Sequence, residues 1–117
     1  MMIVDDSKII RRKIERESHS DQFNVVALAE NGLEAIEMFK TFKPQLVTMD
    51  ITMPEMDGIR CVENLIKIDP SVRILIISAL SDLATGIEAL EKGARGFLCK
   101  PFAQDQLQGA LEELMRK

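Results

Sequence analysis

The fold of this chain is decided by residues 46–58, which read Leu46-Val47-Thr48-Met49-Asp50-Ile51-Thr52-Met53-Pro54-Glu55-Met56-Asp57-Gly58. The apolar start of this stretch predicts a buried strand over residues 45–50, and that strand ends in the carboxylate of Asp50. A loop that contains Pro54 follows, and a helix is predicted over about 58–68. A carboxylate at the end of a buried strand loses hydration, so it needs either compensating partners or a chemical role.

On both sides of this stretch, short apolar segments alternate with amphipathic ones. Strands are predicted over residues 1–4, 25–29, 45–50, 72–78 and 96–99. Helices are predicted over about 7–18, between Asn31 and Pro44, and over about 58–68, 82–92 and 103–116. Five strands that alternate with five helices predict an α/β fold with a parallel sheet covered on both faces. The strand order 2-1-3-4-5, the flavodoxin-like (βα)5 arrangement, is the expected one.

The predicted helices have apolar residues at helical spacing. In the second helix these are Leu33, Ile36, Met38, Phe39 and Phe42. In the fourth helix they are Leu83, Ile87 and Leu90, which we expect to face inward. Asn31 and Ser81 are the predicted N-caps of these two helices. Gly86, inside the fourth helix, predicts a loss of about 1 kcal/mol of helical stability relative to Ala.

Composition limits the functional classes that the chain can belong to. Its 117 residues suit one domain over 1–117, and a net charge of −4 argues against direct binding to nucleic acid, which requires a basic surface. No apolar run approaches the length needed to insert into a membrane, and no signal peptide is visible. Cys61 and Cys99 lie in apolar patterns that favour reduced core thiols of a cytoplasmic protein.

Polar side chains stand at the ends of four predicted strands. The first strand is followed by Asp5 and Asp6, the third ends in Asp50, the fourth ends in Ser78, and Lys100 follows the fifth. In open parallel sheets, ligands bind outside the carboxyl ends of the strands, where the strand order reverses. We therefore expect three carboxylates, one hydroxyl and one ammonium to share a shallow pocket.

This set of groups suits phosphoryl transfer. Three neighbouring carboxylates repel one another, and a hard cation such as Mg²⁺ relieves the repulsion while keeping positions for water and phosphate oxygens. A carboxylate can then act as the nucleophile, and we interpret Asp50 as the group that accepts the phosphoryl. Lys100 and Ser78 would stabilise the charge on the phosphoryl oxygens.

The motifs along the whole chain resemble the receiver domain of response regulators in two-component systems. These motifs are Ile-Val-Asp-Asp-Ser at 3–7, Met-Asp-Ile-Thr-Met-Pro-Glu-Met-Asp-Gly at 49–58, Ser-Ala at 78–79 and Gly-Phe-Leu-Cys-Lys-Pro-Phe at 96–102. Within this family, the chain is most similar to the single-domain regulators of the chemotaxis type.

The resemblance implies a role for each pocket residue. Asp50 would take the phosphoryl group from a histidine kinase, and Lys100 would contact that group or, without it, Asp50. Mg²⁺ would be bound by Asp50, directly by Asp6, through water by Asp5, and by the backbone carbonyl of Thr52. The chain would catalyse only its own phosphorylation and dephosphorylation.

The resemblance also implies a switch. Ser78 would move towards the phosphoryl group and Phe97 would follow, which changes the surface of the fourth helix, fifth strand and fifth helix. A downstream protein would bind this surface, and a phosphatase is a further expected partner. The Lys100–Pro101 peptide is often cis in the family.

Two residues depart from the chemotaxis pattern. Phe97 stands where such regulators often carry Tyr, and the apolar Leu80 stands beside the phosphoryl position, where we expect it to restrict water and slow self-dephosphorylation.

Three alternative functions follow from the same residues. The first is a receiver domain cut from a larger regulator with a DNA-binding or enzymatic output domain. A flavin-binding electron carrier is disfavoured because residues 5–7 are Asp-Asp-Ser rather than a phosphate-binding loop, and because the chain has no Trp or Tyr. A phosphatase with an aspartate nucleophile would need an acid where Thr52 stands.

Overall fold

The computed structural model describes residues 1–18, 23–51 and 58–116. Its strands are β1 (Met2–Val4), β2 (Ala27–Ala29), β3 (Leu46–Met49), β4 (Arg73–Ala79) and β5 (Gly96–Lys100). Its helices are α1 (Lys8–Ser18), α2 (Gly32–Phe42), α3 (Gly58–Ile68), α4 (Leu83–Glu91) and α5 (Gln104–Met115). A short 3-10 turn over Leu80–Asp82 precedes α4.

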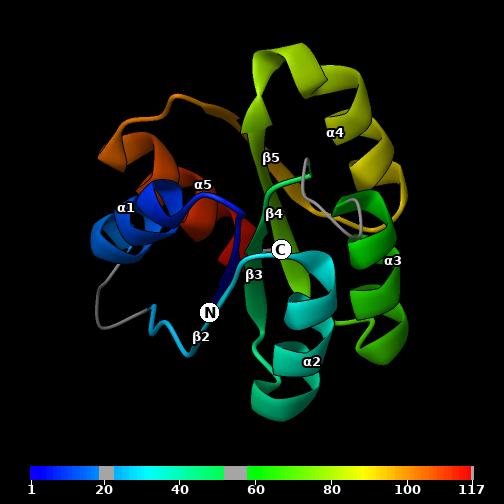
Figure 1. Ribbon diagram of the computed structural model, residues 1–117. Coiled ribbons are helices and arrows are strands. Elements are labelled where there is room, and N and C mark those ends of the chain that lie inside the picture. Colours follow the sequence, from blue (N-terminus) through cyan, green and yellow to red (C-terminus); the bar gives the residue numbers. More distant parts are fainter. Residues whose placement is uncertain (19–22, 52–57, 117) are drawn as a thin grey trace.

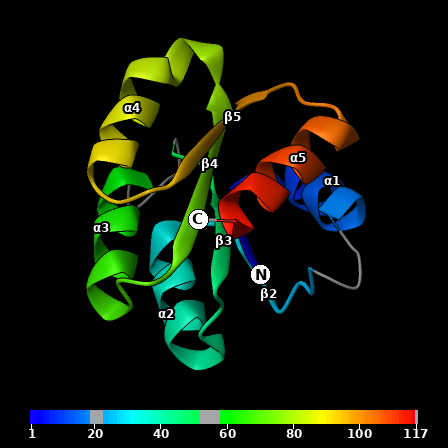
Figure 2. The same cartoon turned by 180° about the vertical axis from the view of Figure 1, so that it is seen from behind.

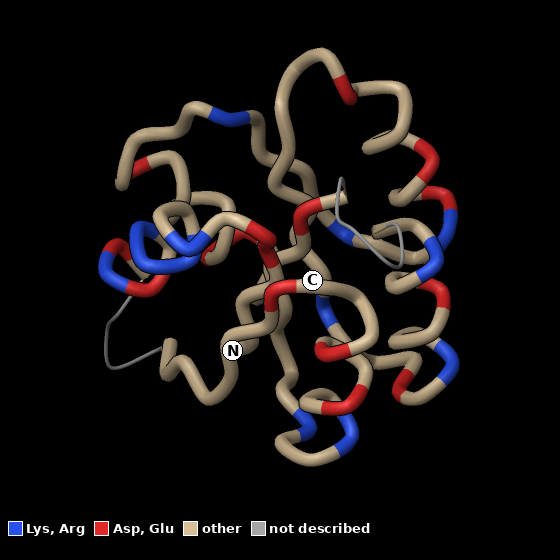
Figure 3. The backbone as a smooth tube through the Cα atoms, viewed as in Figure 1, with Lys and Arg blue, Asp and Glu red and all other residues tan. Residues whose placement is uncertain are grey.

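The five strands form one parallel sheet in the order β2-β1-β3-β4-β5, which confirms the predicted flavodoxin-like topology. Two helices, α1 and α5, cover one face of the sheet, and α2, α3 and α4 cover the other (Figures 1 and 2). Basic and acidic residues are interleaved along α1 and α3 (Figure 3). In the part of the chain that the structure describes, no helix is both long and apolar enough to cross a lipid bilayer.

The alternation of side chains along each strand divides the core into two clusters, one under each helical layer. In β1, for example, Met2 and Val4 belong to one cluster while Ile3 belongs to the other. The central strands are therefore buried on both faces, as covered parallel strands are. Their hydrogen bonding continues past the strand ends, since the amide of Asp5 donates to Ala29 O and that of Asp50 donates to Val4 O. These two bonds fix the backbone at both carboxylates.

The ends of α2 agree with the predicted signals. The Asn31 side chain accepts a hydrogen bond from the Glu34 amide at 2.8 Å, and the helix ends before Lys43, which has a φ of 48°. At α4 the prediction is wrong, because Ser81 is not the N-cap. The 3-10 turn shifts the start of the helix, so that Asp82 takes the N-cap position.

The predicted inward face of α4 is also wrong. Leu83, Ile87 and Leu90 are between 38% and 49% exposed, whereas Gly86 and Ala89 are buried against the sheet. In α2, Leu33 and Phe42 are likewise half-exposed. Small residues face the sheet in α4 because they let the helix backbone approach it closely, and this turns the large apolar residues outward.

Gly58 offers a test of how tightly α3 packs beneath the end of β3. A Cβ on Gly58 would lie 2.3 Å from Ile51 Cα and 2.8 Å from Asp50 O. Because these are backbone atoms, no side-chain rotation can relieve the clash. We expect Gly58→Ala to lower the free energy of unfolding by about 3 kcal/mol in a urea titration.

Gly109 in α5 is the matched control. A Cβ there would meet no atom of the described residues within 4 Å, so Gly109→Ala should raise the free energy of unfolding by up to about 1 kcal/mol. Equal stabilisation by both substitutions would contradict the close packing at Gly58.

Candidate functional site

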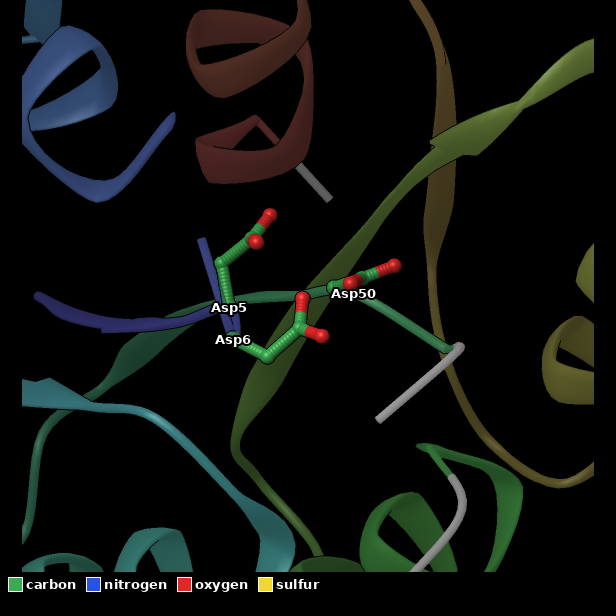
Figure 4. A group of neighbouring side chains, drawn as sticks. All are labelled: Asp5, Asp6 and Asp50. Carbon is green, nitrogen blue, oxygen red and sulfur yellow. The ribbon is translucent and has the colours of Figure 1, made fainter. Parts of the chain in front are cut away.

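Three carboxylates meet at the carboxyl edge of the sheet. Asp5 and Asp6 follow β1 and Asp50 follows β3, the neighbouring parallel strand (Figure 4). One carboxylate oxygen from each lies within 4.8 Å of the others. The sheet thus brings together residues 45 positions apart because it pairs Val4 with Met49, one residue before each strand's acidic end.

The three carboxylates differ in burial and in their partners. Asp5 is 1% exposed and Asp50 is 5% exposed, whereas Asp6 is exposed. Both oxygens of Asp5 accept hydrogen bonds, Oδ1 from the Ser7 amide at 2.9 Å and Oδ2 from Lys100 Nζ at 2.9 Å. Asp5 is therefore a buried carboxylate with a hydrogen bond to each oxygen, and these bonds offset the free-energy cost of removing its charge from water.

Lys100 is the last residue of β5 and contributes the ammonium of the pocket. Its Nζ lies 2.9 Å from Asp5 Oδ2 and 3.9 Å from Asp50 Oδ1. The expected pairing with Asp50 is thus present, but the shorter contact is to Asp5. The peptide bond between Lys100 and Pro101 is cis, as the resemblance implied.

Ser78 is buried near the end of β4, on the strand adjacent to β3. Its hydroxyl donates to Asp82 Oδ2 over 3.3 Å, a long hydrogen bond between a strand and the N-cap of α4. The sequence reasoning did not identify Asp82 as a partner of Ser78. The available signal was a carboxylate four residues after the hydroxyl, at the start of a predicted helix.

Three further residues were predicted to take part in the site or its switch. Phe97 is half-buried on β5 and packs against the core cluster beneath α2, α3 and α4. Leu80 follows the end of β4 and is 67% exposed. Thr52, whose carbonyl was predicted to bind the metal, lies outside the described residues.

The chemistry of the donor set fits Mg²⁺. The three carboxylates offer hard oxygen ligands close enough for one cation to bind, and Mg²⁺ typically uses one or two carboxylates together with water and phosphate oxygens. One ammonium among three carboxylates leaves an excess of negative charge that a cation would reduce. Asp50 contributes an oxygen that can act as a nucleophile in this setting.

Comparisons with known proteins identify the family of the chain. Residues 1–112 match the model of the response regulator receiver domain family. The chain is 42% identical to the chemotaxis protein CheY of Listeria monocytogenes, covering 97% of this chain and 95% of that protein. It is also 42% identical to CheY of Bacillus subtilis, covering 98% of this chain and 96% of that protein.

The fold of the chain is also similar to that of a CheY in a solved structure. The crystal structure of a CheX-CheY-BeF3-Mg complex from Borrelia burgdorferi aligns with a TM-score of 0.91 at 35% identity, covering 99% of this chain and 88% of that one. Phosphorylation and Mg²⁺ binding at an acidic pocket are general properties of receiver domains. By its sequence, its sheet order and its acidic pocket, the chain belongs to the response regulator receiver domain family.

Proposed function

We propose that this chain is a chemotaxis-type signalling switch in which Asp50 accepts a phosphoryl group from a histidine kinase in the cytoplasm. The observation that carries the proposal is the clustering of Asp5, Asp6 and Asp50 within 4.8 Å, beside the ammonium of Lys100. On this proposal, residues 1–117 act as one receiver domain.

The chemical step is a transfer between two nucleophiles. A carboxylate oxygen of Asp50 bonds to phosphorus while the bond from phosphorus to the kinase imidazole breaks, and the imidazole nitrogen keeps the electron pair and is then protonated. Hydrolysis of the resulting aspartyl phosphate returns Asp50 and inorganic phosphate. The chain would thus catalyse its own phosphorylation and dephosphorylation without turning over a separate substrate.

Asp6, Asp5, Asp50 and the Thr52 carbonyl are the residues that would hold Mg²⁺. When bound, the cation would offset the charge of the carboxylates and of the incoming phosphoryl oxygens. Lys100 already contacts Asp5 at 2.9 Å and Asp50 at 3.9 Å. A small movement of its ammonium away from Asp5 would let it bind a phosphoryl oxygen on Asp50.

The proposed switch begins with the Ser78 hydroxyl. To donate to a phosphoryl oxygen on Asp50, this hydroxyl must give up its long hydrogen bond to Asp82. Phe97 would then change position and alter the surface of α4, β5 and α5. Because Phe97 lacks a hydroxyl, it would act through its apolar ring and its position alone.

A downstream protein would read this surface. The exposed apolar residues of α4, which are Leu83, Ile87 and Leu90, supply the contact area that such a partner requires. The relative from Borrelia burgdorferi forms a complex with CheX, which supports a protein partner here. A phosphatase that shortens the lifetime of the aspartyl phosphate is a further expected partner.

Phosphorylation tests the proposal directly. We expect wild-type protein incubated with acetyl phosphate and Mg²⁺ to gain the mass of one phosphoryl group, measured on the intact protein. The gain should be lost in Asp50→Asn, which removes the nucleophile, and without Mg²⁺. Incorporation by Asp50→Asn to the same extent as wild type would contradict Asp50 as the acceptor.

Metal binding should appear in the thermal stability. Mg²⁺ at ten times its dissociation constant should stabilise the folded wild type by about 1.4 kcal/mol, since it binds only the folded site. This corresponds to a rise in Tm of roughly 6 °C. Asp50→Asn should raise the Tm of the metal-free protein by removing one of three repelling charges, and should reduce the shift that Mg²⁺ causes.

The matched control for this experiment is Glu112→Gln, which removes one negative charge from the exposed side of α5. It should leave the response to Mg²⁺ unchanged. A Tm that does not move with Mg²⁺ in the wild type would mean that the three carboxylates do not form the metal site.

The role of Leu80 is tested by the lifetime of the aspartyl phosphate. We expect Leu80→Asn to shorten it about tenfold, equivalent to about 1.4 kcal/mol of activation free energy, because an amide can position water that an apolar side chain excludes. The decay of the phosphorylated mass after removal of the donor measures this. Leu90→Asn, also exposed but farther along α4, is the control, and equal lifetimes in wild type and Leu80→Asn would refute the role.

A further inference from the structure

Gly86 in α4 is in direct contact with the ring of Phe97 on β5. A Cβ added to Gly86 would lie 2.1 Å from Cε2 and 2.5 Å from Cδ2 of that ring. Carbon atoms that are not bonded approach to about 3.5 Å at their closest favourable distance. The edge of the ring therefore occupies the space that any other side chain at position 86 would fill.

This contact accounts for a glycine that costs helical stability. Gly86 is buried in the middle of a nine-residue helix, where Ala would be the better helix former. The helical glycine Gly109 is in open surroundings, since a Cβ there would meet no described atom within 4 Å. Phe97 packs against Gly86, and its ring occupies the space that a side chain at position 86 would fill. We call this space the seat of the ring.

Helix α4 also contacts Ser78, the hydroxyl residue of the proposed switch. Asp82, the N-cap of α4, lies one helical turn before Gly86 and accepts the hydrogen bond from Ser78. Ser78 and Phe97, which both move in the proposed switch, thus both contact the first part of α4. Movement of Ser78 away from Asp82, and of Phe97 away from Gly86, would release two contacts of one helix.

We propose that Gly86 is a positioning residue of the switch, because its lack of a side chain lets α4 hold the Phe97 ring in the position seen here. This inference rests on the proposed role of Phe97. A Cβ at position 86 would push the ring out of its seat without any change at Asp50. The ring would rotate rather than the backbone, since the clash involves the far end of a side chain. Position 86 would therefore set how readily Phe97 leaves α4.

The experiment uses NMR of the full chain with ¹³C-labelled phenylalanine rings. The sequence has 5 Phe, and Phe97→Leu assigns the signals of Phe97. Spectra of wild type, Gly86→Ala and the control Gly109→Ala are compared without ligand and with Mg²⁺ and beryllium fluoride, an analogue of the phosphoryl group. We expect Gly86→Ala alone to shift the Phe97 signals towards the positions that wild type reaches with the analogue, and Gly109→Ala to leave them in place.

Stability gives a second readout that separates the two variants. Gly109→Ala should raise Tm by roughly 4 °C through helix propensity. Gly86→Ala should lower Tm, or raise it less, because the ring loses its seat. In a Phe97→Ala background, which removes the ring, Gly86→Ala should stabilise as much as Gly109→Ala does.

The possible negative results lead to different conclusions. Phe97 signals of Gly86→Ala that coincide with those of the wild type would overturn the seat. If Gly86→Ala does not fold, recovery in Gly86→Ala/Phe97→Ala supports the seat, and no recovery overturns it. Wild-type Phe97 signals that beryllium fluoride and Mg²⁺ leave unmoved would refute the aromatic switch. The regulatory role of Gly86 would fall with it, even where Gly86→Ala displaces the ring.

Discussion

The ion pair between Asp5 and Lys100 is the interaction on which the pocket depends. Asp5 is buried, and a buried carboxylate is strongly destabilising unless it is paired and hydrogen-bonded. Its partner stands at the end of β5, three strands away from β1 in the sheet order. The side chains of Asp5 and Lys100 meet beyond the ends of β3 and β4, and the Lys100 ammonium lies 3.9 Å from Asp50 Oδ1. Both oxygens of Asp5 already accept hydrogen bonds, one of them from Lys100, so a cation bound in the pocket would repel the ammonium of Lys100 and weaken its attraction to Asp5. Charge neutralisation at the carboxylates would thus favour movement of the lysine.

A second set of contacts connects this pocket to the surface. Ser78 and Phe97 lie on adjacent strands, and both contact α4, through Asp82 and through Gly86. The side of α4 towards the sheet consists of small residues, while its large apolar residues are exposed. This arrangement gives the helix few deep anchors and an apolar outer surface. A small change at Ser78 would therefore act on an element that is held by a hydrogen bond, a ring contact and small side chains, rather than by a fully interlocked core.

Much of the architecture could be predicted because parallel sheets impose strict rules. Alternating strands and helices indicated the strand order, and the polar residues at the strand ends indicated the pocket edge. The range 58–68 for α3 agrees with the structure, since Gly58 and Pro70 bracket a clear helical pattern. The failures concentrate at α4. Hydrophobicity alone assigned its Leu and Ile residues to the core, but burial there is decided by how closely the helix backbone approaches the sheet. The cap at Ser81 failed because a 3-10 turn moved the helix start.

The sequence by itself determined the types of group in the pocket and the edge at which they meet, because side-chain alternation and parallel pairing are local rules that a chain of strands and helices must obey. Only the tertiary structure decided the partner of each group. Lys100 lies nearer to Asp5 than to Asp50, Ser78 donates to Asp82, and Phe97 fills the space above Gly86. These choices depend on distances of a few ångströms between side chains on different elements. Such distances are set by the packing of the helices on the sheet, and no pattern along the chain specifies them.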